Sequence, residues 1–360
     1  VGAGNVGATA AQYIVQKQLA DVALVDIAEG LAKGKALDLM QSALVENFDT
    51  KIEGSESYEI TKDSDVVVIT AGIARKPGMS RDDLLNTNAK IVSSVTKSII
   101  QESPNAIIVV VSNPLDVMSY LSWRESGIDS KKVIGMAGVL DSSRYACFLA
   151  EAIGCSIKDV RPMVLGGHGD TMVPVPEYST VNGVPITKLL DAQSIEGINE
   201  RTKHGGAEIV KYLKTGSAFY APASSAVAMV EAILLDTKRV LPCCTYLQGE
   251  YGLSDLYCGV PIQLGSQGVE NIIELDLSES SLSDLQTSAK AVKEFDGEFL
   301  VTGKGVQNQM ESGSLPKTVV VKFKTYEDAL SCYQCEAYEK ALGFIENSSD
   351  RDFVIVEGLD

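Results

Sequence analysis

The chain is poor in positive charge and has no segment in which positive charge gathers. Lys and Arg number 31 against 48 Asp and Glu, which gives 360 residues a net charge of −17 at pH 7. Because phosphate backbones require a basic surface, we expect no nucleic-acid partner. Long apolar runs are also missing, since Ala106–Val111 is far shorter than the ~20 residues that cross a bilayer. We therefore expect no membrane partner.

Cysteine is sparse and odd in number, and no signal peptide is recognisable. The seven cysteines lie mostly among apolar residues, which is typical of reduced thiols and predicts a cytoplasmic protein. Cys332 and Cys335 have redox or zinc spacing, but neither a second Cys pair nor a nearby His completes a metal set. We interpret them as helix residues and predict no metal.

The first part of the chain, residues 1–138, has the pattern of an α/β domain. Short apolar runs at Val22–Val25, Val66–Ile69 and Ile107–Val111 alternate with stretches of helical periodicity. Continuous apolar runs indicate strands that are buried on both faces. The pattern predicts a Rossmann-type, doubly wound parallel sheet covered by helices.

Two further regions follow, a mixed α+β domain over residues 139–282 and a small α+β unit over residues 283–360. In the second domain we expect helices at Asp141–Ile153, Gln193–Leu213 and Pro222–Leu235, and strands near Val160–Leu165, Val240–Leu247 and Leu256–Leu264. In the third we expect a helix to about Phe295, strands at Glu298–Val301, Thr318–Phe323 and Phe353–Val356, and a helix at Tyr326–Leu342.

A glycine-rich turn, Gly2-Ala-Gly4-Asn5-Val6-Gly7, opens the chain and leads into a helical segment, Thr9–Leu19. Such glycines allow a tight turn and let the helix N-terminus approach a pyrophosphate. Asp26 follows the first apolar run, where a carboxylate binds an adenosine ribose and repels a 2′-phosphate. The pair therefore favours NAD over NADP.

Two arginines, Arg75 and Arg81, flank a Pro-Gly turn directly after the second apolar run. Guanidinium groups match carboxylates, and an exposed loop could close over a site at the strand ends. Solvated loop arginines are the alternative, and these residues alone favour it.

Histidine is scarce, with only His168 and His204 in the chain. His168 lies between glycines in Gly166-Gly-His-Gly-Asp170, which core packing does not explain. A histidine held by a buried carboxylate, for which Asp141 is the candidate, has a raised pKa suited to taking the proton of an alcohol. His204 lies in a polar helical stretch and is interpreted as a surface residue.

These motifs, in this order, resemble the lactate/malate dehydrogenase family over residues 1–280. The motifs are Gly2–Gly7, Val25-Asp26, Thr70–Gly72, Arg75–Arg81, Val111-Ser-Asn-Pro-Leu-Asp116, Leu140–Arg144 and Gly166–Asp170. The resemblance implies an NAD-dependent oxidoreductase that acts on a 2-hydroxy acid and assembles as a homodimer or tetramer.

The resemblance also implies roles for single residues. His168 would be the acid/base, with Asp141 as its orienting carboxylate, and Arg144 would hold the C1 carboxylate while Arg81 polarises the C2 oxygen. The implied cofactor-binding residues are Gly2, Gly4, Asn5, Val6, Gly7, Asp26, Thr70, Ala71, Gly72, Asn88, Val111, Ser112 and Asn113, the last also contacting substrate.

The resemblance implies that Arg75 is the residue that selects the substrate. Lactate-specific relatives typically have Gln at the matching position, whereas Arg complements the second carboxylate of oxaloacetate. An unpaired charge in a closed site would be costly. The resemblance therefore implies oxidation of (S)-malate to oxaloacetate and the reverse reaction, with lactate or another 2-hydroxy acid as the alternative.

Two features depart from the family pattern. Family members have a central β-strand directly before the glycine turn, and here only Val1 remains of it, so we expect its neighbours to lack ladder partners.

After residue 280 the chain continues into segments such as Val319–Phe323, which resemble a small ferredoxin-like family of unknown function that pairs as α/β-barrel dimers. A fusion of two genes, natural or artificial, is one interpretation. An inactive binding or assembly module is the alternative to an enzyme.

Overall fold

In the computed structural model the described backbone covers residues 1–73, 81–293, 298–303 and 318–322. Described side chains leave out residues 81 and 82 and end at residue 290. The chain divides into two compact units, Val1–Val292 and Lys293–Asp360. The first contains both large predicted domains, and the boundaries at residues 138 and 282 remain predictions.

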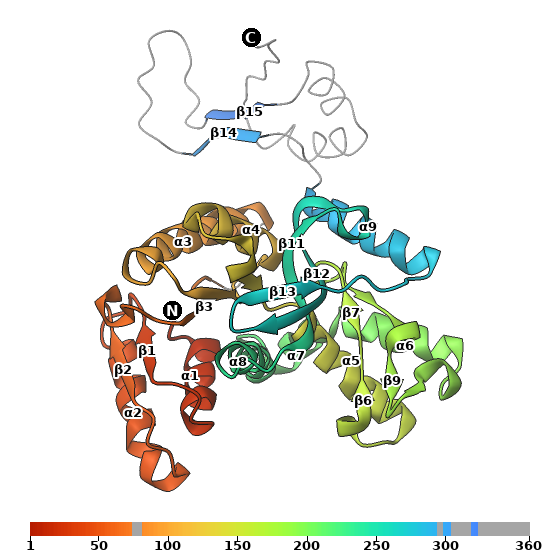
Figure 1. Ribbon diagram of the computed structural model, residues 1–360, viewed down its shortest axis with the longest axis horizontal. Helices are drawn as coiled ribbons and strands as arrows, with labels where there is room; N and C mark the ends of the chain where they lie inside the picture. Colours follow the sequence, from red (N-terminus) through yellow and green to blue (C-terminus); the bar gives the residue numbers. More distant parts are fainter. Residues whose placement is uncertain (74–80, 294–297, 304–317, 323–360) are drawn as a thin grey trace. The chain divides into compact units, whose positions relative to one another are not determined.

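A six-stranded mixed sheet forms the centre of the first unit (Figure 1). Its order is β13-β12-β11-β5-β4-β3, with β3 to β5 parallel and β11 antiparallel to β5. These strands are β3 (Val66–Ile69), β4 (Ile107–Val110), β5 (Val133–Gly135), β11 (Arg239–Gln248), β12 (Ser254–Gly265) and β13 (Gly268–Ile272). The strands predicted at Val66–Ile69, Ile107–Val111, Val240–Leu247 and Leu256–Leu264 are therefore present, and the two predicted domains share one sheet.

The strands β1 (Val22–Val25) and β2 (Ile52–Ser55) form a separate parallel pair. Val1 and Gly2 lie between this pair and the large sheet: the Gly2 amide donates to the Val25 carbonyl (2.7 Å), and the Thr70 amide donates to the Val1 carbonyl (2.9 Å). A cavity of about 160 Å³ lies beside them, lined by residues of β1, β3 and α1. The strands β1 and β3 belong to different sheets, and these two bonds hold the glycine turn between them.

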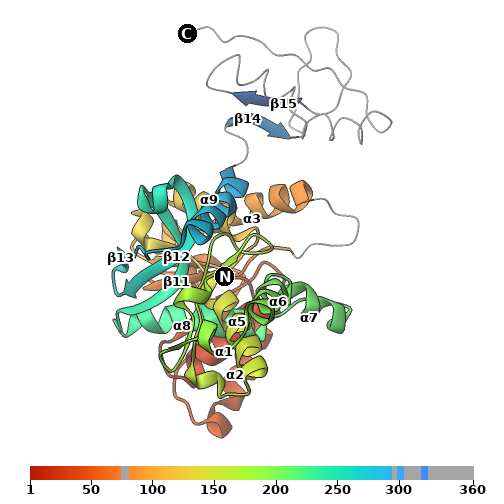
Figure 2. The ribbon, with the colours of Figure 1, turned by 90° about the vertical axis from the view of Figure 1, so that its right-hand side faces the viewer.

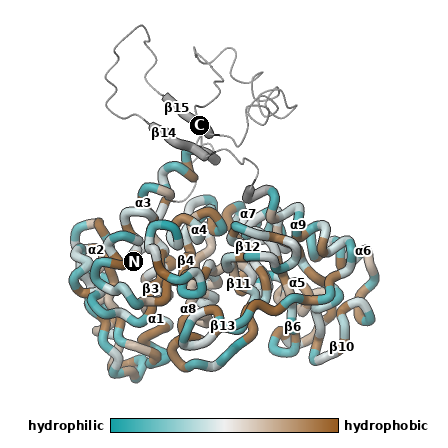
Figure 3. Tube along the Cα trace, turned by 45° about the horizontal axis from the view of Figure 1, so that its top comes forward, coloured by the Kyte–Doolittle hydropathy of each residue, from teal (hydrophilic) through white to brown (hydrophobic). Residues whose placement is uncertain are grey.

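Helices cover both faces of the parallel strands. On one face lie α1 (Asn5–Gln16) and α8 (Tyr220–Leu234), and on the other α3 (Arg81–Glu102) and α4 (Leu115–Ser126). Alternate residues of β4 enter separate cores, with Ile107 and Val109 toward α8 and Ile108 and Val110 toward α3 and α4. Brown apolar segments accordingly follow the strands in Figure 3. The parallel strands are buried on both faces, as their continuous apolar runs predict.

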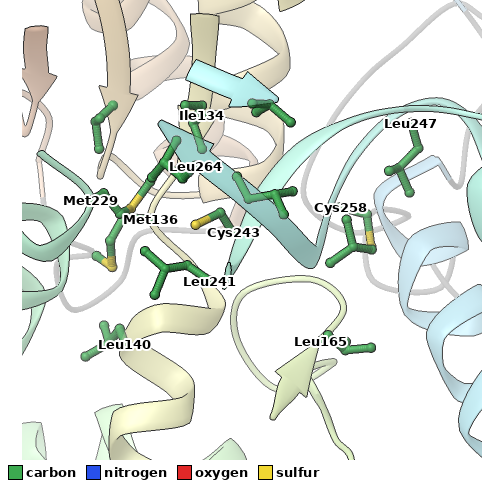
Figure 4. Close-up of a cluster of buried hydrophobic side chains, with 14 of the residues drawn as sticks. Ile134, Met136, Leu140, Leu165, Met229, Leu241, Cys243, Leu247, Cys258 and Leu264 are labelled. Atoms are coloured by element: carbon green, nitrogen blue, oxygen red, sulfur yellow. The ribbon is translucent and has the colours of Figure 1, made fainter. Parts of the chain in front are cut away.

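The second half of this unit packs around α5 (Gly138–Ile153). In Figure 4, Leu140 of α5, Met229 of α8 and Leu241 of β11 point into one apolar cluster with Ile134. The remaining elements are α2 (Leu31–Glu46), α6 (Ala192–Lys203), α7 (Gly205–Leu213), α9 (Glu279–Lys293), β6 (Val160–Arg161), β7 (Val164–Leu165), β8 (Val173–Pro174), β9 (Thr180–Val181) and β10 (Val184–Pro185). Figure 2 shows α6 and α7 in sequence at one edge of the unit.

Several predicted elements have different bounds in the structure, and the strand predicted near Val160–Leu165 is two strands, β6 and β7, in different sheets. The first helix begins at Asn5 instead of Thr9, because the glycine turn itself enters the helix. The stretch predicted as one helix over Gln193–Leu213 is two helices that meet at exposed His204, which follows α6 and precedes α7. The surface position predicted for this histidine is confirmed.

The second unit contains an antiparallel pair, β14 (Glu298–Gly303) and β15 (Thr318–Lys322), at the places where strands are predicted. The predicted helix at Tyr326–Leu342, the strand at Phe353–Val356 and the residues Cys332 and Cys335 lie outside the described residues.

Candidate active site

The glycine turn lies at the carboxyl edge of the parallel strands and is shaped by close backbone contacts. Gly2 has φ +97°, and a Cβ at Gly7 would lie 1.8 Å from the Gly2 carbonyl oxygen, so a side chain at Gly7 would collide with backbone. At Gly4, the N-cap of α1, a Cβ would meet nothing within 4 Å. The turn is thus tight where strand and helix meet and open at the helix N-terminus.

Asp26 follows β1 and braces the same turn. Its Oδ2 accepts from the Ala3 amide (2.6 Å), and its Oδ1 accepts from the Ala28 amide (2.9 Å). The helix α1 begins at Asn5, followed by Val6. Its first turn contains no acidic residue, and no side chain caps it. The helix N-terminus therefore keeps its partial positive charge for an anion. This cradle fits the pyrophosphate and ribose of a dinucleotide.

Loops after β3 and β4 meet beside the turn. The Thr70 hydroxyl donates to the Gly2 carbonyl (2.9 Å), and the Ser112 hydroxyl donates to the carbonyl of Ala71 (2.6 Å). The buried residue Val111 continues β4, and its amide donates a hydrogen bond to the Ile69 carbonyl. The segments predicted to line a cofactor are therefore side by side.

Asn88, on α3, connects these two loops. Its Nδ2 donates to the carbonyls of Ile73 (3.1 Å) and Asn113 (2.7 Å), and its Oδ1 accepts from the Ile73 amide (2.8 Å). A Cβ at Gly72 would lie 3.2 Å from the same oxygen. Asn88 thus fixes the loops, whereas the side chain of Asn113 is exposed beside them.

His168 and Asp141 form a nearly buried pair. His168 Nδ1 lies 2.8 Å from Asp141 Oδ2, and the two side chains are 13% and 2% exposed. Burial lowers the pKa of His168, but the charge of Asp141 and its hydrogen bond outweigh burial, so the pKa is raised above its ordinary value. The structure thus brings together the two residues that the sequence analysis paired.

Arg144 lies one helical turn after Asp141 on α5. Its Nη1 donates to Asp141 Oδ1 (3.1 Å), and its side chain is 14% exposed. Within the described structure its Nε is buried and has no hydrogen-bond partner. Asp141 thus holds the guanidinium beside His168, and a guanidinium fork matches a carboxylate.

Three contacts to the backbone of the histidine loop could not be foreseen. The Gly166 amide donates to the Gly259 carbonyl (2.8 Å), the Gly167 amide to Ser288 Oγ (2.9 Å), and the His168 amide to Asp116 Oδ2 (3.0 Å). Asp116 is part of a motif quoted above, but Ser288 on α9 carries no sequence signal.

Arg75 lies outside the described residues, and Arg81 begins α3 with its side chain outside them. Among the residues that the structure describes, no group of three or more His, Cys, Asp or Glu could hold a metal ion. A search of the same residues finds no helix long and apolar enough to cross a membrane.

Family models match the whole first unit. The NAD binding domain of lactate/malate dehydrogenases matches residues 1–135, and their alpha/beta C-terminal domain matches residues 138–296. The malate dehydrogenase of Pelodictyon phaeoclathratiforme is 56% identical over 295 residues, which are 82% of this chain and 95% of that protein. The chain belongs to the lactate/malate dehydrogenase family. The resemblance seen in the sequence is confirmed, and the chain is an NAD-dependent oxidoreductase.

Solved structures of this dehydrogenase family share the fold. The malate dehydrogenase of Salinibacter ruber has a TM-score of 0.78 and 49% identity and covers 81% of this chain and 94% of its own. A lactate dehydrogenase of Cryptosporidium parvum, complexed with lactic acid and nicotinamide adenine dinucleotide, has a TM-score of 0.79 and 41% identity. It covers 81% of this chain and 94% of its own. Residues 285–359 match a domain of unknown function, DUF1330.

Proposed function

We propose that this dehydrogenase interconverts (S)-malate and oxaloacetate. The observation that carries the proposal is the His168–Asp141–Arg144 group, in which Asp141 of α5 contacts both a histidine whose pKa is raised and an arginine. A proton acceptor and a carboxylate fork are the two groups that hydride removal from a 2-hydroxy acid requires. The relatives named malate dehydrogenase support the choice of substrate.

In the proposed mechanism Asp141 holds His168 by Nδ1, which leaves Nε2 to take the hydroxyl proton of malate. Arg144 binds the C1 carboxylate and so directs the C2 hydroxyl toward that nitrogen. Bound NAD supplies the acceptor for the C2 hydride. In the reverse direction protonated His168 gives its Nε2 proton to the C2 oxygen of oxaloacetate, while Arg81 stabilises the negative charge that develops there.

The cofactor would lie along the carboxyl edge of the parallel strands. We assign its pyrophosphate to the turn of Gly2, Gly4 and Gly7 at the start of α1, and its ribose to Asp26. The loops after β3 and β4, which Asn88 joins, would line the rest. The hydrogen bonds among these segments and the open helix N-terminus support this assignment.

Arg75 would pair with the second carboxylate, and this separates malate from the alternative substrate, lactate. The test follows NADH absorbance with oxaloacetate and with pyruvate for the purified chain and for Arg75→Gln. We expect the ratio of kcat/KM for oxaloacetate to that for pyruvate to fall by roughly 100-fold in the variant, because one charged pair in a closed site is lost. A wild-type preference for pyruvate would reject malate and oxaloacetate as the substrate pair.

The same assay decides the non-enzymatic alternative. A folded protein that binds NADH but turns over neither substrate would favour a binding or assembly module. The observation behind that alternative is the second unit, which matches a domain with no assigned activity.

We also propose a homo-oligomer in the cytoplasm. Leu44 and Val45 on α2 are 93% and 83% exposed, and Tyr212 on α7 is 75% exposed. Large apolar side chains on open helix faces are typical of subunit contacts. The free thiols of Cys147, Cys155, Cys243, Cys244 and Cys258 support a reducing compartment.

A further inference from the structure

Asp116 is a buried carboxylate that the proposed mechanism does not use. It lies in the first turn of α4 and is 6% exposed. In the described structure it forms no ion pair, and burial raises its pKa. A carboxylate in such surroundings is costly unless its oxygens find donors.

Both oxygens have a specific donor from a distant part of the chain. Oδ2 accepts from the His168 amide at 3.0 Å, across 52 residues. Oδ1 accepts from the thiol of Cys244, which is fully buried on β11, at 3.2 Å. The carboxylate therefore connects α4, the central sheet and the backbone of the histidine.

The Gly166 and Gly167 amides are held by Gly259 and Ser288, and the bond to Asp116 holds the amide of His168 itself. His168 follows Gly166 and Gly167 and precedes Gly169, and glycine leaves the backbone freer than any other residue. Asp141 fixes only the ring, through Nδ1. A ring bond alone does not determine where Nε2 points, because the backbone that carries the ring must also be fixed.

We propose that Asp116 is a positioning residue for His168, acting on its main-chain amide, and that the Cys244 thiol keeps the Asp116 carboxylate in place. The inference rests on the proposed acid–base role of His168. Asp116 does not reach the substrate; it sets the direction of Nε2 from behind the loop.

The charge of Asp116 also contributes to the site. Among the side chains that the structure describes, the charged groups that act on His168 are Asp141 and Arg144 from α5 and Asp116 from α4. Asp141 and Asp116 raise the pKa of His168, and Arg144 lowers it. Removing the charge at Asp116 while keeping an acceptor therefore separates the electrostatic effect from the hydrogen bond.

The test compares Asp116→Asn, Asp116→Ala, Cys244→Ser and Cys244→Ala in the full chain. Ser122→Ala is the matched control, since Ser122 is equally buried on α4 but pairs with Thr96. The readouts are kcat, the Kd of NADH and the pKa of His168 from NMR. Because the chain has only two histidines, exposed His204 serves as an internal reference.

We expect Asp116→Ala to lower kcat roughly 10- to 100-fold with an unchanged Kd for NADH, because a charged hydrogen bond and the direction of Nε2 are lost. Asp116→Asn keeps an acceptor, so it should retain most of the wild-type kcat. Its His168 pKa should fall, while the pKa of His204 should not change. Cys244→Ser keeps a donor and resembles the wild type, whereas Cys244→Ala loses activity.

A folded Asp116→Ala protein with the kcat of Ser122→Ala and an unmoved His168 resonance would overturn the inference. If Asp116→Ala does not fold, the comparison of Cys244→Ser with Cys244→Ala decides, and equal activity of the two rejects the role. Failure of the proposed function looks different: the wild type would be inactive, or His168→Gln would remain active. The pKa of His168 from NMR tests the effect of Asp116 on His168 whether or not the wild type is active.

Discussion

Replacing Asp141 by Asn tests the acid–base assignment most directly. The change keeps the shape of the side chain but removes the charge that lies 2.8 Å from His168 Nδ1. Because both side chains are nearly buried, solvent screens this pair little. A hydrogen bond to a charged group contributes about 2 kcal/mol, which corresponds to roughly 30-fold in kcat/KM for oxaloacetate.

The pH profile gives the sharper signature. Reduction of oxaloacetate needs protonated His168, so activity falls as pH rises through the pKa of this residue. In the wild type Asp141 raises that pKa. In the variant burial and Arg144, which both lower the pKa, remain without this opposition. The descending limb should therefore move to lower pH.

The assay follows NADH consumption from about pH 5 to about pH 9, the range in which histidines titrate. The exposed carboxylate of Asp159, changed to Asn, is the matched control. A descending limb that stays at its wild-type position in Asp141→Asn, with a loss under about 3-fold, would refute the reasoning.

Three further changes test the rest of the site and the assembly. Arg144→Lys should raise KM for oxaloacetate roughly 10- to 100-fold, because an ammonium cannot form the two-pronged bond, and NADH fluorescence should report an unchanged Kd. Asp26→Ser should raise the NADPH-to-NADH ratio of kcat/KM roughly 10-fold by removing repulsion of a 2′-phosphate, and an unchanged ratio would contradict the ribose assignment. Leu44→Lys should shift sedimentation toward the monomer while the free energy of unfolding of the subunit changes by less than about 0.5 kcal/mol; an unaltered sedimentation profile would exclude α2 from the interface.

Local patterns were enough to predict much of the fold and the central pair. Buried strands could be predicted at Val66–Ile69 and Ile107–Val110, because a parallel sheet covered on both faces needs continuous apolar runs. His168 is conspicuous because glycines surround a rare residue type, and the buried carboxylate that it needs lies in the Leu140–Arg144 motif. In both cases the signal lies within a few neighbouring residues.

The remaining features depend on contacts between distant segments. Nothing near Ser288 shows that its hydroxyl meets the amide of Gly167 across 121 residues. Likewise, the sequence shows Cys244 only as one apolar residue of a strand. Its thiol reaches Asp116 because β11 pairs with β5. The shared sheet could not be predicted because strand order is a tertiary property, which the alternation of apolar residues does not encode.

The bond between Gly167 and Ser288 has a consequence for synthesis on the ribosome. A chain emerges from its N-terminus, and domains generally fold as they appear. The parallel strands and the glycine turn are made long before α9 leaves the ribosome, but the hydroxyl that fixes Gly167 belongs to α9, near the end of the first unit. The histidine loop therefore acquires its full framework only after nearly 290 residues have been made. A nascent chain released earlier would carry both residues of the acid–base pair but would lack the Ser288 bond to their loop.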